Sequence, residues 1–584
     1  MFPFRAVLLG LLLFSAASVD SQTTAQIPAN EPTFRANVRV VLVDVVVTKG
    51  AGEPVTGLPK DDFQVFEDGH AQTIASFEER AGLPDLPALA RRAQLPPNSF
   101  SNSPLVKTGD AANVLLLDAL NTPLADQSYV HSEMLKYIKE IQPGTRLAIF
   151  TLGEQLRFVQ GFTTDASVLA AALSGKKTAG NPSLSPLLMA GTDVDANQLM
   201  LEQIQGMPGT AAAAAGLQSF LHQSVSFETR VRVQITLQAM QQLARYLGGF
   251  PGRKNVIWFT SSFPVPLFGP VTETEVVETA NLLSAAEVSI YPIGAAGLAP
   301  DRHYDFDNQR APRIVASGQS VEQVHTQYQN RDLQMGQIQR ARTFAQMDLL
   351  AQDTGGEALY NLNELDESVA RVLKEGTHYY TLTYSPTNRN MDGQLRHIEI
   401  KLRGEKYHLA YRRGYYATAE MLSPTAHAAP GGDPLRPLMD HGTPDATEIL
   451  YTIQLAHSTP APGSARAGDN ANLKGPLTRY TVHFTVSADR LTLDPGPDGV
   501  RHGDLEATLV GYDRDGKPLN WMVRTMQLTV PPDRYASAQA SGLPFSLEID
   551  VPEAATYLRS GVYDLGSNKA GTLEIPLSAV VARK

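Results

Sequence analysis

The chain contains no cysteine. Disulfide bonds, a cysteine nucleophile and a lipid-carrying cysteine are therefore excluded. An exported chain of this composition must take its stability from packed hydrophobic cores. An exported chain without cysteine is more typical of a bacterial envelope or secreted protein than of a eukaryotic extracellular protein.

Dense positive charge and long apolar runs are also missing. The formal net charge is −11 over 584 residues, and no window carries the lysine and arginine stripe that a phosphate backbone selects. We expect no nucleic acid partner. Beyond the N-terminus no stretch reaches the ~20 apolar residues of a membrane span, so none is expected in the mature chain.

The first residues, "MFPFRAVLLGLLLFSAASVDSQ", form a targeting pattern. Arg5 precedes an apolar run of roughly ten residues, and small residues follow around Ala17 to Ser21. This predicts a secretory signal peptide over 1–21, and hence an exported chain that is periplasmic or secreted. An uncleaved N-terminal anchor is the alternative.

The usual signatures of catalysis are absent. The sequence has no G-x-S-x-G, P-loop, G-x-G-x-x-G or H-E-x-x-H. With 43% hydrophobic and 19% charged residues it is nevertheless an ordinary globular mix, long enough for several domains. These observations favour a non-enzymatic, multidomain protein.

The order of strand-like and helix-like segments predicts an α/β plus all-β chain. Continuous apolar strands that alternate with amphipathic helices over 113–375 indicate a doubly wound, mostly parallel sheet. This unit is inserted in, or flanked by, a β-sandwich, and an immunoglobulin-like β-sandwich ends the chain. The expected units are an N-terminal β unit (35–79), a linker (80–112), the α/β domain (113–375), strands that pair with the N-terminal unit (376–418), a second linker (419–444) and the C-terminal sandwich (445–584).

Asp118 closes the apolar run in "VLLLDALNTPLADQ". Ligands of doubly wound sheets bind at the carboxyl ends of the strands, where Asp118 is expected. A divalent ion there needs several oxygen ligands. Within this turn the spacing of two offers Asp118, Leu120 and Thr122, and Leu120 has no oxygen to give.

Several segments resemble a known family. "LLAQDTGGEALYNLNELDESVARVL" and the D-x-x-x-T turn are similar to von Willebrand factor A domains. More closely, "VTGLPKDDFQVFEDGHAQTIASF", "LLLDALNTPLADQ", "GRKNVIWFTSSFP" and "YYTLTYSPTNRNMDGQLRHIEIKL" resemble the VWFA-related domain family described from acidobacterial proteins. The resemblance covers about 35–418, and "LRSGVYDLGSNKAGTLEIPL" near the C-terminus is similar too.

The resemblance implies a metal-dependent adhesion site, and this chain departs from it. Asp118 matches the first ligand, Thr122 the last hydroxyl of the motif, and Thr229, placed before a helix, a threonine from a second loop. The third loop carries Ser261 and Ser262 where a carboxylate is expected. The weakened set would hold Mg²⁺ or another divalent cation poorly. We therefore favour no cofactor, with Asp118 and Asn121 hydrogen-bonding to backbone amides and shaping the turn.

The favoured function is binding of a protein partner, not identified by the sequence, through the strand-end loops of a degenerate A-type domain. Asn121 and Ser262 are the candidate partner-binding residues. A metal-dependent hydrolase centred on Asp118 is one alternative. A structural envelope component that attaches through the C-terminal sandwich is another.

Overall fold

A computed structural model represents the chain. It describes residues 40–50, 52–81, 95–103, 112–141, 145–174, 211–250, 252–261, 270–294, 344–345, 347–360, 369–373, 378–404, 407–417, 435–459, 465–496 and 498–580. The predicted signal peptide and Ser262 lie outside these ranges. Within them the fold is mixed α/β, with several antiparallel sheets and one sheet that contains parallel strands. No helix in these ranges has the length and apolar character that a membrane crossing requires.

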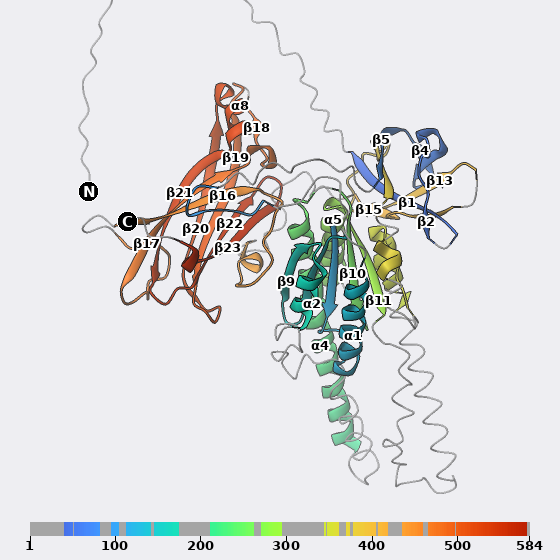
Figure 1. The fold of residues 1–584 in the computed structure, drawn as a ribbon, viewed down its shortest axis with the longest axis horizontal. Coiled ribbons are helices and arrows are strands. Elements are labelled where there is room, and N and C mark those ends of the chain that lie inside the picture. The colour runs from blue at the N-terminus through green and yellow to red at the C-terminus, as the bar shows by residue number, and fades with distance from the viewer. Residues whose placement is uncertain are drawn as a thin grey trace, which may run out of the picture. The chain divides into compact units, whose positions relative to one another are not determined.

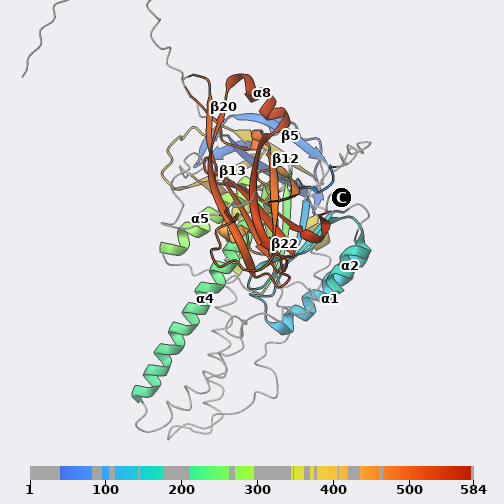
Figure 2. The same ribbon diagram turned by 90° about the vertical axis from the view of Figure 1, so that its left-hand side faces the viewer.

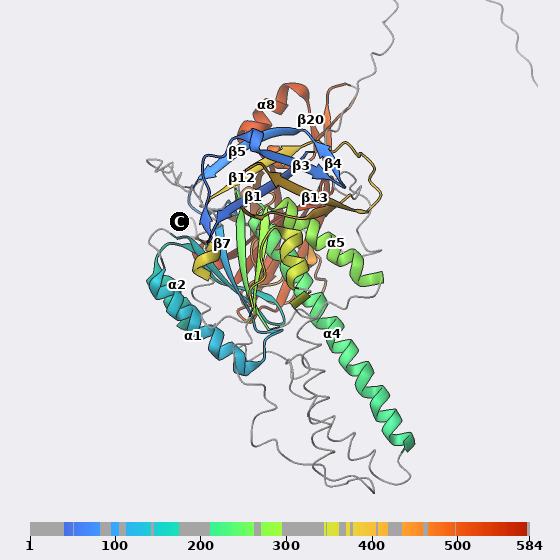
Figure 3. The same ribbon diagram turned by 90° about the vertical axis from the view of Figure 1, so that its right-hand side faces the viewer.

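Strands from before and after the α/β unit in sequence form two antiparallel sheets (Figure 3). The first has the order β14 (His408–Ala410), β1 (Val41–Lys49), β12 (His378–Tyr384) and β5 (Ile74–Ala81), with β2 (Glu53–Pro54) beside β1. The second has the order β15 (Gly414–Tyr416), β13 (Leu395–Leu402), β3 (Phe63–Glu67) and β4 (His70–Gln72). Their buried faces share one hydrophobic core.

Local sequence explains how these strands form. Val43, Val45 and Val47 alternate along β1 and belong to the hydrophobic core of this unit. The residues between them are also buried, so both faces of β1 are covered over most of its length. Asp68 and Gly69 both have positive φ, at 48° and 80°, which the two-residue turn between β3 and β4 needs. Val43 of β1 lies opposite Leu382 of β12, so residues more than 300 positions apart complete one sheet.

The α/β unit is built on a five-stranded sheet with the order β11-β10-β7-β8-β9. β7 (Ala112–Asp118), β8 (Leu147–Leu152), β10 (Lys254–Thr260) and β11 (Val288–Gly294) are parallel, whereas the edge strand β9 (Leu156–Thr163) is antiparallel to β8. β7 is central. Asp118 therefore lies at the carboxyl end of the middle strand.

Helices cover both faces of this sheet (Figure 1). α1 (Leu124–Glu140) and α2 (Ala166–Ser174) pack against Leu115, Ile257 and neighbouring residues on one face. α4 (Ala211–Leu247) and α5 (Pro270–Ala285) pack against Val114, Trp258 and their neighbours on the other. The continuous apolar runs of β7 and β10 follow from this double coverage.

The helix α4 is longer than the sequence pattern predicts. Periodic apolar positions indicate a helix only from about 228, but the helix begins at Ala211 and has 37 residues. The added turns begin in an alanine run, which has high helix propensity without any amphipathic period. Figure 1 shows this N-terminal half extending past the carboxyl ends of the parallel strands, and Figure 2 shows the full length of α4.

The C-terminal sandwich also consists of two antiparallel sheets. One has the order β21 (Leu543–Pro552), β17 (Leu477–Val486), β16 (Tyr451–Ser458) and β6 (Ser99–Ser101). The other has the order β18 (Asp494–Pro495), β19 (Arg501–Tyr512), β22 (Tyr557–Asp564) and β23 (Lys569–Pro576), with β20 (Pro518–Val530) beside β19. The core between them includes Val482, Leu509, Ile549 and Leu558. The helix α8 (Pro532–Ser541) follows β20.

Two expected linkers contain ordered structure. The segment 80–112 includes β6, which adds a strand to the C-terminal sandwich, although its three residues are too few to show a periodic pattern. In the segment 419–444, residues from 435 onward form the short 3-10 helix η6 (Arg436–Leu438) and a stretch fastened to the sandwich. Composition alone missed both because their partners are remote in sequence.

Candidate functional site

The turn that follows β7 is closed by the side chain of Asp118. Its Oδ1 accepts a hydrogen bond from the Asn121 backbone amide at 2.9 Å. Its Oδ2 accepts one from the Asn121 side-chain amide, also at 2.9 Å. Aspartate readily binds amides a few residues ahead in a turn, so this geometry is a local property of the D-x-x-N sequence.

The neighbouring strand β10 supplies two more donors. Trp258 Nε1 donates to Asp118 Oδ2 at 3.1 Å, and the Thr260 hydroxyl also hydrogen-bonds to the Asp118 side chain. Trp258 and Thr260 are both fully buried. Asp118 therefore has four donors from the protein, which matches the roughly four acceptor positions of a carboxylate.

The helix α4 holds the turn through Asn121. The Asn121 side-chain amide donates to Thr236 Oγ1 at 3.0 Å. Arg232 donates from Nε and Nη2 to Asn121 Oδ1 at 3.2 and 3.0 Å. Both polar atoms of the Asn121 side chain are thus bound, and the turn is fixed to the helix by a forked guanidinium contact.

Burial dominates the electrostatics of this cluster. Asp118 is only 3% exposed, and Asn121 and Thr236 are fully buried. Burial raises the pKa of Asp118 above its ordinary value, and the hydrogen bonds from Asn121 and Thr260 and the charge of Arg232 oppose part of that rise. The carboxylate is an internal structural group with neutralising contacts, and not one open to substrate.

Thr122 and Ser261 join the ends of two elements. Thr122 Oγ1 accepts a hydrogen bond from the Ser261 backbone amide at 3.2 Å, and Thr122 is 3% exposed. Ser261 Oγ donates to Asp126 Oδ2 at 3.4 Å. These contacts connect the end of β10 to the first turn of α1.

Thr229 does not have the predicted position. It lies inside α4 instead of before a helix, about two helical turns before Thr236, which is the threonine that contacts Asn121. Sequence reasoning missed Thr236, Arg232, Trp258 and Thr260. The run that contains Trp258 and Thr260 was recognised as a strand, but nothing in a single sequence shows that Arg232 and Thr236 approach the β7 turn.

The donor set at Asp118 does not fit a divalent cation. Its carboxylate oxygens are already engaged by protein donors, and the fully buried Leu120 offers no oxygen. Within the described ranges no cluster of three or more histidine, aspartate or glutamate residues is placed to hold a metal ion. Oxygen ligands in sufficient number are what replaces the hydration shell of Mg²⁺ or Ca²⁺.

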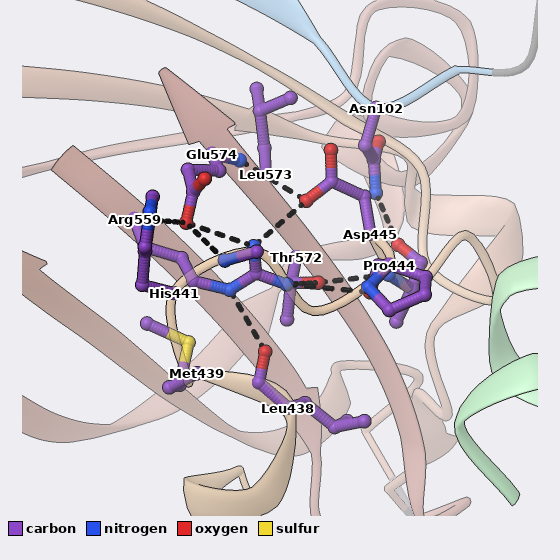
Figure 4. Close-up of polar contacts among 12 residues, drawn as sticks. Asn102, Leu438, Met439, His441, Pro444, Asp445, Arg559, Thr572, Leu573 and Glu574 are labelled. Carbon is purple, nitrogen blue, oxygen red and sulfur yellow. Dashed lines mark hydrogen bonds and ion pairs between the residues drawn. The ribbon is translucent and has the colours of Figure 1, made fainter. Parts of the chain in front are cut away.

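A second polar cluster, built around a buried arginine, lies in the C-terminal sandwich (Figure 4). Arg559 of β22 is fully buried and donates to the backbone oxygens of Leu438 and Pro444, at 2.9 and 3.3 Å. It also forms ion pairs with Asp445 at 3.3 Å and Glu574 at 3.4 Å. Burial raises the pKa of Asp445 to about 7, and Arg559 lowers it in part. One guanidinium therefore fastens residues 438–445 to β22 and β23.

Comparisons with known proteins identify no family. No protein-family model matches the chain, and no curated protein matches it. Among solved structures, an aerotolerance-related membrane protein from Bacteroides fragilis NCTC 9343 is 12% identical, with 45% of this chain and 99% of that chain covered and a TM-score of 0.23. The conserved hypothetical protein BatB from Bacteroides thetaiotaomicron is also 12% identical, with 45% of this chain and 98% of that chain covered and a TM-score of 0.21.

The pilus adhesin SpaC from Lactobacillus rhamnosus GG is 11% identical, with 92% of this chain and 59% of that chain covered and a TM-score of 0.24. Likenesses at these TM-scores do not define a shared fold. The function has to be argued from the residues themselves.

Proposed function

We propose that the chain is an exported, non-enzymatic protein-binding protein. Its α/β unit is a degenerate A-type domain that contacts a protein partner through the loops at the carboxyl ends of the parallel strands. The signal-peptide pattern supports export to the periplasm or the exterior. The observation that carries the proposal is that Asp118, the central acidic group of this edge, is buried and receives four hydrogen bonds from the protein.

A hydrolase needs a carboxylate that can reach substrate, activated water or a metal. Asp118 is held away from all three by its own turn, by β10 and, through Asn121, by α4. The hydrogen bonds around Asp118 instead make this turn a rigid support for a recognition loop. They fix the backbone of the turn so that the exposed residues around it keep one arrangement.

The exposed residues beside the turn form the proposed contact surface. The Ala119 and Leu120 amides donate to the Leu152 carbonyl, which brings the β8–β9 turn next to the β7 turn. Glu154 and Gln155 are exposed in the β8–β9 turn, and Ser128 is exposed in the first turns of α1. The N-terminal half of α4 rises about 30 Å beside this edge.

Crosslinking tests the surface directly. The tagged full chain is incubated with the exported protein fraction of the producing organism, crosslinked and analysed by mass spectrometry. Ser128→Arg combined with Gln155→Arg should lower the yield of the specific crosslinked partner by about tenfold, since each added charge enters the contact. Gln527→Arg, an equally exposed site on β20, is the matched control and should leave the yield unchanged.

Equal partner yield from all three proteins would overturn the proposed surface. The hydrolase alternative has its own readout: metal-stimulated turnover of model esters or phosphodiesters that disappears in Asp118→Asn. Such turnover would replace the binding proposal with an enzymatic one.

A further inference from the structure

The helix α4 ends against a residue of the C-terminal sandwich. The last carbonyl groups of an α-helix have no partner within the helix and need a cap. The Arg245 carbonyl accepts a hydrogen bond from the Thr447 amide at 3.0 Å, and the Tyr246 carbonyl accepts one from Thr447 Oγ1 at 2.6 Å. The Gly249 amide donates to the same hydroxyl at 2.9 Å. A threonine about 200 residues further along the chain therefore caps α4.

Two glycines at the end of α4 make room for this contact. A helix is commonly closed by a glycine of positive φ, but neither Gly248 nor Gly249 has a positive φ. A Cβ atom on Gly249 would lie 2.3 Å from the Thr447 carbonyl oxygen. One on Gly248 would lie 2.9 Å from Cγ of Glu448. The two positions lack a side chain so that the sandwich can approach the helix end closely.

An ion pair reinforces the cap. Arg245 Nη1 donates to Glu448 Oε2 at 2.7 Å and to the Asn568 carbonyl at 2.8 Å. The side chains of Arg245 and Glu448 are only 13% and 15% exposed. Glu448 Oε2 also accepts a hydrogen bond from the Ala570 amide at 3.0 Å, which connects the pair to β23. A cation in the last turn of a helix is itself favourable, so charge and cap stabilise the same helix end.

The segment that carries Thr447 is fixed to the sandwich. The Ile449 amide donates to the Ala570 carbonyl at 3.0 Å. Asn102 Nδ2 donates to the Ala446 and Ile449 carbonyl oxygens at 3.0 and 2.8 Å, and Asn102 is 6% exposed (Figure 4). Hydrogen bonds therefore hold the backbone on both sides of Thr447. The cap of α4 is a built part of the C-terminal sandwich.

The same helix holds the β7 turn at its other contact. Arg232 and Thr236 of α4 both bind Asn121, whose amides engage Asp118. Thr236 lies about 15 Å along the helix from Tyr246. Because each turn of an α-helix is hydrogen-bonded to the next, its length is nearly constant. A fixed C-terminal end therefore fixes the axial position of Arg232 and Thr236.

We propose that Thr447 is a positioning residue for the partner-binding edge, and that the C-terminal sandwich controls, through α4, how firmly the β7 turn is held. The role of the edge rests on the proposed function, whereas the coupling between cap and turn is a property of the chain alone. Partner binding at the edge and docking of the sandwich on α4 then stabilise each other, because coupling between two sites is reciprocal.

Hydrogen exchange of the full chain measures the coupling. Thr447→Val removes the capping hydroxyl and keeps nearly the same side-chain shape. Peptides that span residues 119–123 should then exchange about threefold to tenfold faster, the effect of losing one or two hydrogen bonds. Thr447→Ser keeps the hydroxyl and should exchange at close to the wild-type rate. Thr508→Val is the matched control, since Thr508 is buried in β19 and its hydroxyl has no hydrogen-bond partner among the described residues. It should leave the exchange of the turn unchanged.

A second background separates coupling through α4 from a general loss of stability. Arg232→Met combined with Thr236→Val removes the contacts of both side chains with Asn121. Thr447→Val should then add nothing to the exchange of residues 119–123, whereas a general loss of stability would add in full.

Equal exchange of the turn in wild type and Thr447→Val would overturn the coupling, as would an undiminished effect of Thr447→Val in the second background. The readout needs no partner, so this outcome is distinct from a failure of the proposed function, which the crosslinking yield reports.

Discussion

Asn121 donates to both carboxylate oxygens of Asp118, from its backbone amide to Oδ1 and from its side-chain amide to Oδ2, each at 2.9 Å. The two residues form a closed ring of hydrogen bonds at the carboxyl end of the central strand. Asn121 thereby engages both oxygens of a buried carboxylate. The stability of the α/β unit should therefore depend on this pair.

Asp118→Ala should lower the free energy of unfolding of the α/β unit by about 3 kcal/mol or more. The substitution leaves four buried donors, from Asn121, Trp258 and Thr260, without their acceptor. Urea unfolding followed by the fluorescence of Trp258, in a Trp521→Phe background, measures the change. Ser128→Ala, at an exposed position of α1, should shift the midpoint little. An Asp118→Ala midpoint equal to that of this control would contradict the structural role.

Arg232→Met should destabilise the same unit by about 1–2 kcal/mol, because Asn121 Oδ1 loses both of its guanidinium donors. Arg232→Lys should be intermediate, since one ammonium cannot reproduce the fork. Hydrogen exchange of peptides that span residues 119–123, compared among the three proteins, measures the loosening of the turn. Exchange that is equally slow in wild type and Arg232→Met would show that α4 does not hold the turn.

Calorimetric titration of the purified chain with Mg²⁺, Mn²⁺ and Ca²⁺ should show no binding tighter than about 1 mM. The reason is that protein donors already engage both oxygens of Asp118. Asp118→Ala serves as the control for heats that arise elsewhere on the molecule. Tighter binding that disappears in this variant would restore the metal-dependent alternatives.

The pH dependence of the C-terminal sandwich should reflect Asp445, whose pKa burial raises to about 7. A carboxyl group with a raised folded pKa binds its proton more tightly in the folded state. Its contribution to stability is therefore present at low pH and is lost as the pH rises from about 4 to about 7. Wild type should lose stability relative to Asp445→Asn across this window.

Urea-dependent hydrogen exchange of peptides from β22 and β23 reads this change at each pH. Asp515→Asn, in an exposed turn, is the matched control and should run parallel to wild type. A difference between wild type and Asp445→Asn that stays constant, or that grows in favour of wild type with rising pH, would contradict the raised pKa.

The strands of the parallel sheet could be predicted because each is a continuous apolar run between helical segments. "NVLLLD" and "NVIWFT" are covered on both faces, so burial leaves a strong local pattern. The hydrogen bond from the Asn121 amide to Asp118 was also predictable, because it joins residues three apart within one turn. Local chemistry determined both features.

Two features that depend on remote partners, the contacts of α4 with the β7 turn and the pairing of β6, were not predictable from one sequence. Thr236 and Arg232 reach Asn121 only because α4 packs across the sheet, whereas the family resemblance pointed to Thr229. β6 has three residues, too few for any periodicity, and its partner is about 350 residues away. The start of α4 was also not predicted, because the alanine run there forms a helix through its high helix propensity and has no periodic apolar positions.

The strand β6 is synthesised early, but its place in the sheet exists only after β16 has been synthesised. Phe100 leaves the ribosome about 350 residues before the strand it packs beside, an interval of roughly 20–70 s at ~5–20 residues per second. Single domains fold within milliseconds to seconds once their residues are present. The early segment β6 can therefore pair only after the intervening α/β unit has been synthesised and has had time to fold. The synthesis of β16 determines when β6 can take its place in the sheet.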